Sequence, residues 1–186
     1  QIRKHITGLM VAAACLVGLK PSFAQEQPIV QNRILFVFDG SQSMFGHWES
    51  GMKIDIAKSM LVELVDSLQN VENLDLAFRA YGHQSPYISG SQRDCKDTKL
   101  EVPFNSGGAW DIKKALDRIQ PKGTTPIAYS LEQSAKDFPP CVNCRNMIIL
   151  ITDGIEECYG DPCTVSLALQ SKGIVLKPFV IGIGLD

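Results

Sequence analysis

The chain has 186 residues, of which 45% are hydrophobic and 20% charged, and its formal net charge is -2. A length of this order suits one domain with a core of its own. A slightly acidic chain offers no basic surface that could neutralise phosphates, so nucleic-acid binding is not predicted.

Residues 1–24 are predicted to be a secretory signal peptide. Basic residues precede an apolar stretch at 6–19, and Ser22-Phe23-Ala24 supplies the small residues that a signal peptidase reads. The stretch falls short of the roughly 20 apolar residues that a spanning helix needs, so no membrane span is expected in the mature chain. A lipoprotein signal that uses Cys15 is an alternative, although Ala stands where such signals usually carry Leu.

After a linker at 25–32, the mature chain alternates apolar strands with amphipathic helices. Strands are predicted at 34–38, 74–81, 99–104, 147–152 and 174–184, and helices at 54–68, from the cap Asn105-Ser106 to about 119, at 125–138 and at 161–171. Pro178 cannot donate to a strand ladder, so pairing in the last strand is placed at 179–183.

This order of elements predicts an α/β fold over residues 33–186. The sheet should be doubly wound and mostly parallel, with helices on both faces and right-handed crossovers. The short strand near Leu100 is expected to be its antiparallel edge. No internal repeat is visible, so a single domain is predicted.

Three separated segments place oxygen-bearing side chains where apolar strands end or a helix begins. Asp39, Ser41 and Ser43 follow the first strand directly, Thr125 opens a predicted helix, and Asp153 follows the strand at 147–152. Ligands of open α/β sheets sit at the carboxyl ends of the strands, so these side chains are expected to converge at one edge. Hard oxygen donors of this kind suit a divalent cation.

The composition of this set favours Mg²⁺ or Mn²⁺. Two carboxylates leave a divalent ion with net attraction for one more anionic ligand. Ca²⁺ prefers more oxygens and bidentate carboxylates, and Zn²⁺ prefers His and Cys, neither of which belongs to the set. Thr124 is adjacent to Thr125 and is an alternative source of the hydroxyl. Glu156 and Glu157 are predicted to form a solvated acidic rim.

With these motifs the chain resembles the von Willebrand factor A (VWA) domain family, specifically its secreted bacterial members with a metal-ion-dependent adhesion site. Asp39, Ser41 and Ser43 match the D-x-S-x-S motif, Thr125 the single threonine, and Asp153 the T-D-G segment. The resemblance implies a Rossmann-like fold that lacks its last helix and strand, hence a C-terminally truncated domain. It also implies direct coordination by the serines, and a carboxylate from a partner protein that completes the metal shell.

Five cysteines follow the signal peptide, and an exported chain lets them pair. Cys158 with Cys163 would staple the loop after Asp153, and Cys141 with Cys144 would close a small loop before a strand. That leaves Cys95 unpaired or joined to a residue outside this sequence. The four paired cysteines also have a spacing faintly similar to a zinc ribbon, but a buried strand separates the two pairs.

The predicted function is that of an exported, non-catalytic binding module, in the periplasm, on the cell surface or outside the cell. It would use the metal to capture an acidic group of a partner protein. Two alternatives stay open. One is a metal-dependent phosphatase or hydrolase with Asp39 or Ser41 as nucleophile, although no histidine is convincingly placed as its base. The other is a VWA domain whose metal is purely structural.

Overall fold

The structure is a computed structural model that describes residues 29–48, 51–88, 94–105 and 108–180. The predicted signal peptide, including Cys15, lies outside the described residues, as do Ser106 and positions 181–184 of the predicted last strand. No described helix is long and apolar enough to cross a membrane.

Five strands form the main sheet: β1 (Gln31–Asp39), β4 (Leu74–Tyr81), β5 (Thr98–Asn105), β6 (Cys144–Thr152) and β7 (Ile174–Val180). Their order is β5-β4-β1-β6-β7. All neighbours pair in parallel except β4 and β5, which are antiparallel. The mostly parallel sheet with an antiparallel edge near Leu100 is therefore confirmed.

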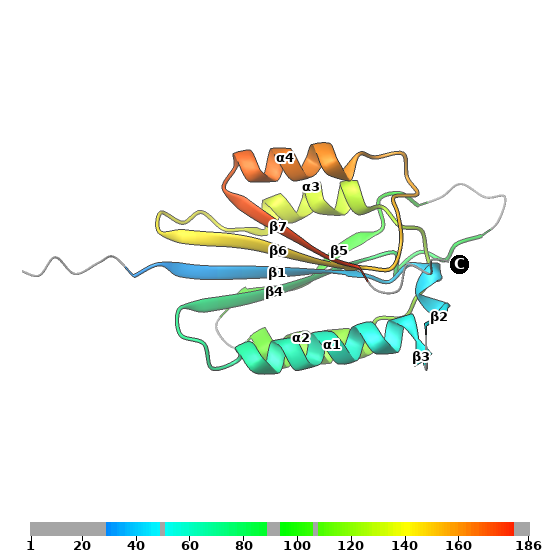
Figure 1. The fold of residues 1–186 in the computed structure, drawn as a ribbon, viewed down its shortest axis with the longest axis horizontal. Coiled ribbons are helices and arrows are strands. Elements are labelled where there is room, and N and C mark those ends of the chain that lie inside the picture. Colours follow the sequence, from blue (N-terminus) through cyan, green and yellow to red (C-terminus); the bar gives the residue numbers. More distant parts are fainter. Residues whose placement is uncertain (1–28, 49–50, 89–93, 106–107, 181–186) are drawn as a thin grey trace, which may run out of the picture.

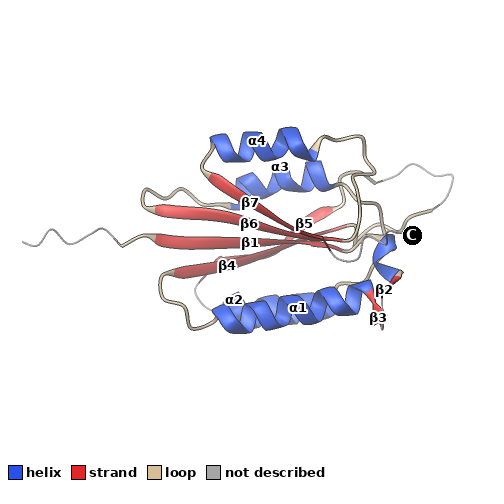
Figure 2. Ribbon diagram, viewed as in Figure 1, coloured by secondary structure: helices blue, strands red, loops and turns tan. Residues whose placement is uncertain are grey.

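Helices cover both faces of this sheet, as Figures 1 and 2 show. On one face lie α1 (Lys53–Leu68) and α2 (Gly108–Arg118), and on the other α3 (Ile127–Asp137) and α4 (Pro162–Ser171). A 3-10 turn, η1 (Gln42–Phe45), and a short ribbon of β2 (His47–Trp48) and β3 (Gly51–Met52) precede α1. The doubly wound α/β architecture predicted from the sequence is confirmed.

The central strand β1 is buried on both sides. Phe36 and Phe38 pack into the core under α1 and α2, whereas Leu35 and Val37 pack into the core under α3, and all four are fully buried. This double burial explains the uninterrupted apolar run of β1, which is typical of inner parallel strands. The run ends at Asp39, so the first polar side chain lies where the strand leaves the core.

Pro178 does not limit the last strand as predicted. The strand β7 pairs with β6 from Ile174 to Val180, and Pro178 lies opposite Leu150 within that ladder. The expectation of pairing only from residue 179 was wrong. Because β7 is the outermost described strand on its side of the sheet, one edge has no described neighbour and a missing N–H is tolerated there.

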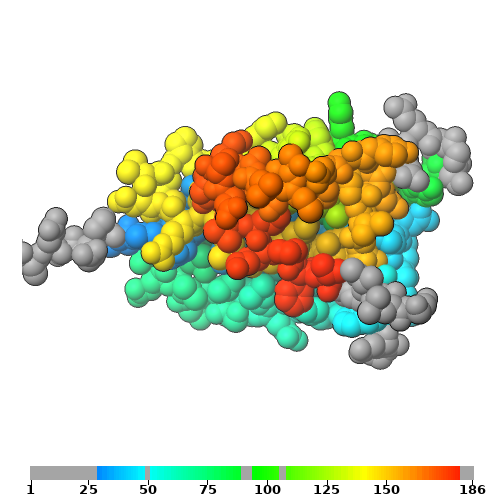
Figure 3. Space-filling model, turned by 45° about the horizontal axis from the view of Figure 1, so that its top comes forward, coloured from blue at the N-terminus to red at the C-terminus, as the bar shows by residue number. Residues whose placement is uncertain are grey.

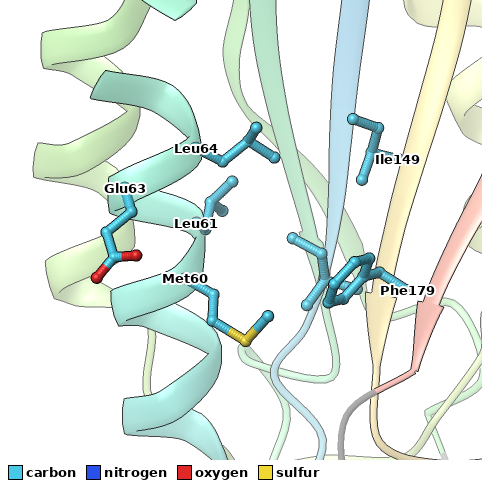
Figure 4. A pocket seen from close by; sticks show the side chains of 7 residues that line it. Met60, Leu61, Glu63, Leu64, Ile149 and Phe179 are labelled. Carbon is cyan, nitrogen blue, oxygen red and sulfur yellow. The ribbon is translucent and has the colours of Figure 1, made fainter. Parts of the chain in front are cut away.

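A groove lies between α1 and the outer part of the sheet. Its volume is about 390 Å³, and its lining is mainly apolar: Met60, Leu61, Glu63, Leu64, Ile149, Ile151 and Phe179. Figure 4 shows Phe179 of β7 facing the side chains of α1 across this groove. In Figure 3, β7 reaches the surface between α4 and α1. No described helix covers this part of the sheet.

Candidate metal centre

The parallel pairing of β1 with β6 brings two distant aspartates to one edge of the sheet. Phe38 pairs with Ile151, so Asp39 ends β1 beside the end of β6, and Asp153 follows that strand directly. Both carboxylates are buried, and η1 begins within a few residues of Asp39 at the same edge (Figure 1). The register thus places the first and last predicted ligands next to each other.

Hydrogen bonds connect four of the five predicted ligands. The hydroxyl oxygens of Ser41 and Ser43 lie 2.9 Å apart, and the Ser43 hydroxyl donates to Asp153 Oδ1 at 2.8 Å. The backbone N–H of Ser41 donates to Asp39 Oδ1 at 2.8 Å. Ser41 is buried but Ser43 is exposed, so the cluster opens to solvent on one side.

Asp39 is held by groups that sequence analysis missed. The Thr152 hydroxyl donates to Asp39 Oδ2 at 2.7 Å. Burial raises the pKa of Asp39, while hydrogen bonds from Ser41 and Thr152 act in the opposite direction. Tyr81 pairs with Asp39 across β1 and β4, and burial, followed by the charge of Asp39, raises the pKa of Tyr81. Thr152 and Tyr81 could have been found as the last residues of the neighbouring strands.

The two adjacent threonines have different partners. The Thr124 hydroxyl donates to the Asp94 carbonyl at 3.0 Å and so is engaged with the loop after β4. Thr125 is 2% exposed, and a Cβ placed on Gly154 would lie 4.0 Å from Thr125 Cγ2 and 3.8 Å from Ser43 Oγ. The Thr125 side chain therefore lies against the turn that follows Asp153. Of the two threonines, Thr125 is the one that this contact places beside the Asp153 turn.

Glu156 does not belong to a solvated rim. Its carboxylate accepts hydrogen bonds from the N–H groups of Ala128 and Cys158, both at 2.7 Å. Glu157 is exposed, but its carboxylate accepts from the Thr125 N–H at 3.2 Å. A carboxylate at the first turn of α3 is favourable because helix N-termini carry partial positive charge. These two residues tie the loop after Asp153 to the Thr125 loop.

The predicted disulfide between Cys158 and Cys163 is wrong. Cys158 is bonded to Cys95, and Cys163 is an exposed free thiol in the first turn of α4. The loop after β4 packs against the Thr124 loop, which brings Cys95 to Cys158, whereas the Asp161 cap holds the Cys163 backbone in α4. The spacing of the cysteines along the sequence could not show this loop contact.

The other expected disulfide, between Cys141 and Cys144, is present in the structure. Cys144 is the first residue of β6, so this disulfide closes the turn that leads into the strand. Since Cys95, Cys141, Cys144 and Cys158 are all in disulfides, the zinc-ribbon alternative loses three of its four thiolates. The disulfides agree with an oxidising compartment.

A cation of the chain itself reaches the cluster. Lys53 Nζ lies 2.9 Å from Asp153 Oδ2, and the two side chains are only 18% and 1% exposed. Sequence analysis assigned no role to Lys53, because it stands at the start of a helix and far along the chain from Asp153. The signal that could have found it is a basic residue at a helix N-terminus, where cations are disfavoured.

Comparison with known proteins identifies the architecture around this cluster. The family model for the von Willebrand factor type A domain matches residues 34–186. The Bacillus subtilis protein YwmD is 33% identical over 182 residues, which cover 94% of this chain and 80% of YwmD. The residues that the family model matches include every member of the cluster described above.

Solved structures share the fold at low sequence identity. BatB from Bacteroides thetaiotaomicron has a TM-score of 0.66 and 23% identity, over 81% of this chain and 66% of BatB. Proximal thread matrix protein 1 of the mussel byssus, with a zinc-occupied MIDAS motif, has a TM-score of 0.63 and 22% identity, over 83% of this chain and 37% of that protein. Identities this low establish the fold alone.

Proposed function

The chain belongs to the von Willebrand factor type A domain family, and on that basis we propose that it is an exported, non-catalytic binding module. A divalent metal held by Asp39, Ser41, Ser43, Thr125 and Asp153 captures an acidic group of a partner protein. The observation that carries this proposal is the hydrogen-bonded cluster of oxygens that two distant segments, residues 39–43 and Asp153, form at one sheet edge.

The types of donor in this cluster support Mg²⁺ or Mn²⁺. Two carboxylates with neutral hydroxyls suit a small hard cation that keeps some of its waters, whereas Ca²⁺ takes about 6–8 oxygens and often bidentate carboxylates. The Ser41 and Ser43 hydroxyls are 2.9 Å apart, and the step from Ser43 to Asp153 is 2.8 Å. When bound, the metal would supply Lewis acidity toward an outside carboxylate. Ser41, Ser43 and Asp153 would be among the residues that hold it.

The surroundings of the cluster support a protein as ligand. Phe45 in η1, Ile155 after Asp153, and Tyr159 are 50%, 79% and 98% exposed. Apolar side chains displayed around a polar centre are typical of protein interaction sites. Tyr159 also has a positive φ of 62°, which non-glycine residues adopt at a cost and which is frequent at functional sites. We infer that the partner presents an acidic residue among apolar ones.

Export is supported by the sequence and by the disulfides. The first 24 residues have the pattern of a secretory signal, and disulfides persist in oxidising compartments. The compartment after export is periplasmic, cell-surface or extracellular.

The enzymatic alternative is weakened by the same contacts. Asp39 is 0% exposed, so its carboxylate cannot reach a phosphate ester in solution as a nucleophile must. In the described part of the chain, the side-chain partners of the Ser41 hydroxyl are Ser43 and Asp39, and no histidine is among them. A serine nucleophile needs a base within hydrogen-bond reach.

Selection of peptides tests metal-dependent capture. The immobilised chain is exposed to a random peptide library in MnCl₂, and bound peptides are released with EDTA. Selected peptides are expected to contain Asp or Glu, and their Asn or Gln counterparts should bind at least about tenfold more weakly, because an amide brings no negative charge to the metal. Equal binding of both versions, or retention in excess EDTA, would contradict capture. Metal-dependent melting with metal-independent peptide binding would indicate a structural metal.

A further inference from the structure

Lys53 is built into the edge of the candidate metal centre. Its backbone N–H donates to the Gly46 carbonyl at 2.9 Å, and the Gly46 N–H donates to the Ser43 carbonyl at 2.8 Å. The turn that carries Ser43 therefore also fixes the backbone N–H of Lys53. Its ammonium then reaches Asp153 Oδ2 at 2.9 Å.

The side chain of Lys53 lies beside Gly46. A Cβ placed on Gly46 would lie 3.4 Å from Lys53 Cε and 3.6 Å from Lys53 Nζ, so the end of the lysine passes directly over the glycine. Its side chain is only 18% exposed, although lysine is among the residues most often exposed. The ammonium is thus enclosed between the η1 turn and the carboxylate.

The helix gains nothing from a lysine at this position. Lys53 is the first residue of α1, and cations are disfavoured at helix N-termini, where the helix dipole favours negative charge. The Met52 cap supplies no side-chain hydrogen bond that would compensate. The contact with Asp153 is therefore the interaction that accounts for Lys53 at this position.

Lys53 and a divalent metal would use the same carboxylate. Asp153 Oδ1 accepts from Ser43 and Oδ2 accepts from Lys53, so both oxygens already have partners. Asp39 and Asp153 carry at most two negative charges, and Lys53 offsets one of them. A metal that binds through Oδ1 or through water would also be repelled by an ammonium nearby.

We propose that Lys53 is a resident cation that sets the metal affinity of this site by competing for Asp153. The inference rests on the proposed function, since it requires that the site takes a metal. The lysine keeps the affinity moderate, so that occupancy follows the metal concentration of the compartment. Lys53 also affects selectivity. Ions of lower charge density displace an ammonium less effectively, so they bind to the site more weakly.

Calorimetric titration with MnCl₂ tests the role of Lys53. Lys53→Met is expected to bind Mn²⁺ about tenfold or more tightly than the unchanged chain, because the competing charge is gone. Lys53→Arg keeps the charge and should stay within about threefold of the unchanged chain. Lys114→Met is the matched control, since Lys114 is exposed on α2 and lies outside the cluster. If Lys53→Met does not fold, Lys53→Gln replaces it.

The outcomes separate the two proposals. Tighter binding by the neutral variant alone supports the role of Lys53, as does uptake by the neutral variant when the unchanged chain binds nothing measurable. Equal or weaker binding by Lys53→Met, with clear uptake by the unchanged chain, overturns the inference and leaves the metal site standing. Uptake by neither chain overturns both.

Discussion

Replacing Asp39 by asparagine is expected to weaken Mn²⁺ binding by about 100-fold or more, because it removes one of only two carboxylates in the site and ligand charge strongly sets the affinity for hard cations. Calorimetric titration measures this directly. Asp117→Asn is the matched control, since it makes the same change on the exposed surface of α2. Asp117→Asn should bind as the unchanged chain does.

The Asp39→Asn variant should keep its fold without metal. The amide that replaces the carboxylate would still accept from the Ser41 N–H, and the Thr152 hydroxyl, now donating at 2.7 Å, can turn to accept from the amide. Urea unfolding in EDTA at neutral pH checks this. If the Asp39→Asn chain is unfolded there, its loss of metal binding reports on folding and the assignment of Asp39 as a ligand loses its support.

The pH dependence of stability provides a second signature of Asp39. Burial raises its pKa in the folded chain. A carboxyl with a raised pKa holds its proton more tightly when folded, so its contribution is fully present below the unfolded value of about 3.9 and is lost as the pH rises through the folded value. Metal-free wild-type chain should therefore lose stability over that window, and Asp39→Asn should lose less.

Removing the disulfide between Cys95 and Cys158 is expected to lower the free energy of unfolding by about 2–4 kcal/mol. The bond closes a segment with a sequence separation of 63, and losing it frees a long loop in the unfolded chain. Urea unfolding of Cys95→Ser/Cys158→Ser measures the change. The double variant should also bind Mn²⁺ more weakly. Cys158 is next to Glu157, which accepts from the Thr125 N–H, and the Cys158 N–H itself donates to Glu156, so freeing Cys158 loosens the loop beside Thr125.

Cys163→Ser is the control for this pairing. Cys163 is exposed and free, so its replacement should change stability by no more than about 0.5 kcal/mol. A large loss in Cys163→Ser, with little effect from Cys95→Ser, would mean that the bond joins Cys158 to Cys163. Peptide mapping of the unreduced chain would then show that bond directly.

The sheet and the cluster could be predicted because their signals are local. The uninterrupted apolar residues from Ile34 to Phe38 indicate a strand that is buried on both faces, and polar residues follow where the strand ends. Parallel strands bring their carboxyl ends to one edge whatever the intervening loops contain. Asp39 and Asp153 could therefore be placed together without knowledge of any loop.

Features that depend on loop packing could not be predicted in this way. The pairing of Cys95 with Cys158 requires that the loop after β4 lies against Thr124, which no periodicity encodes. The cap that Glu156 gives to α3 and the contact of Lys53 with Asp153 likewise join segments far apart in the sequence. Pro178 was misjudged because the rule against proline applies to inner strands, and β7 is the outermost described strand on its side.

Anomalous diffraction from crystals soaked in MnCl₂ shows where the metal binds. We expect one manganese peak per chain, at about 2.0–2.3 Å from the hydroxyl oxygens of Ser41 and Ser43, with a carboxylate or water in the remaining open position. A peak elsewhere on the chain, or no peak in a well-ordered crystal whose Ser41 and Ser43 are free of lattice contacts, would contradict it.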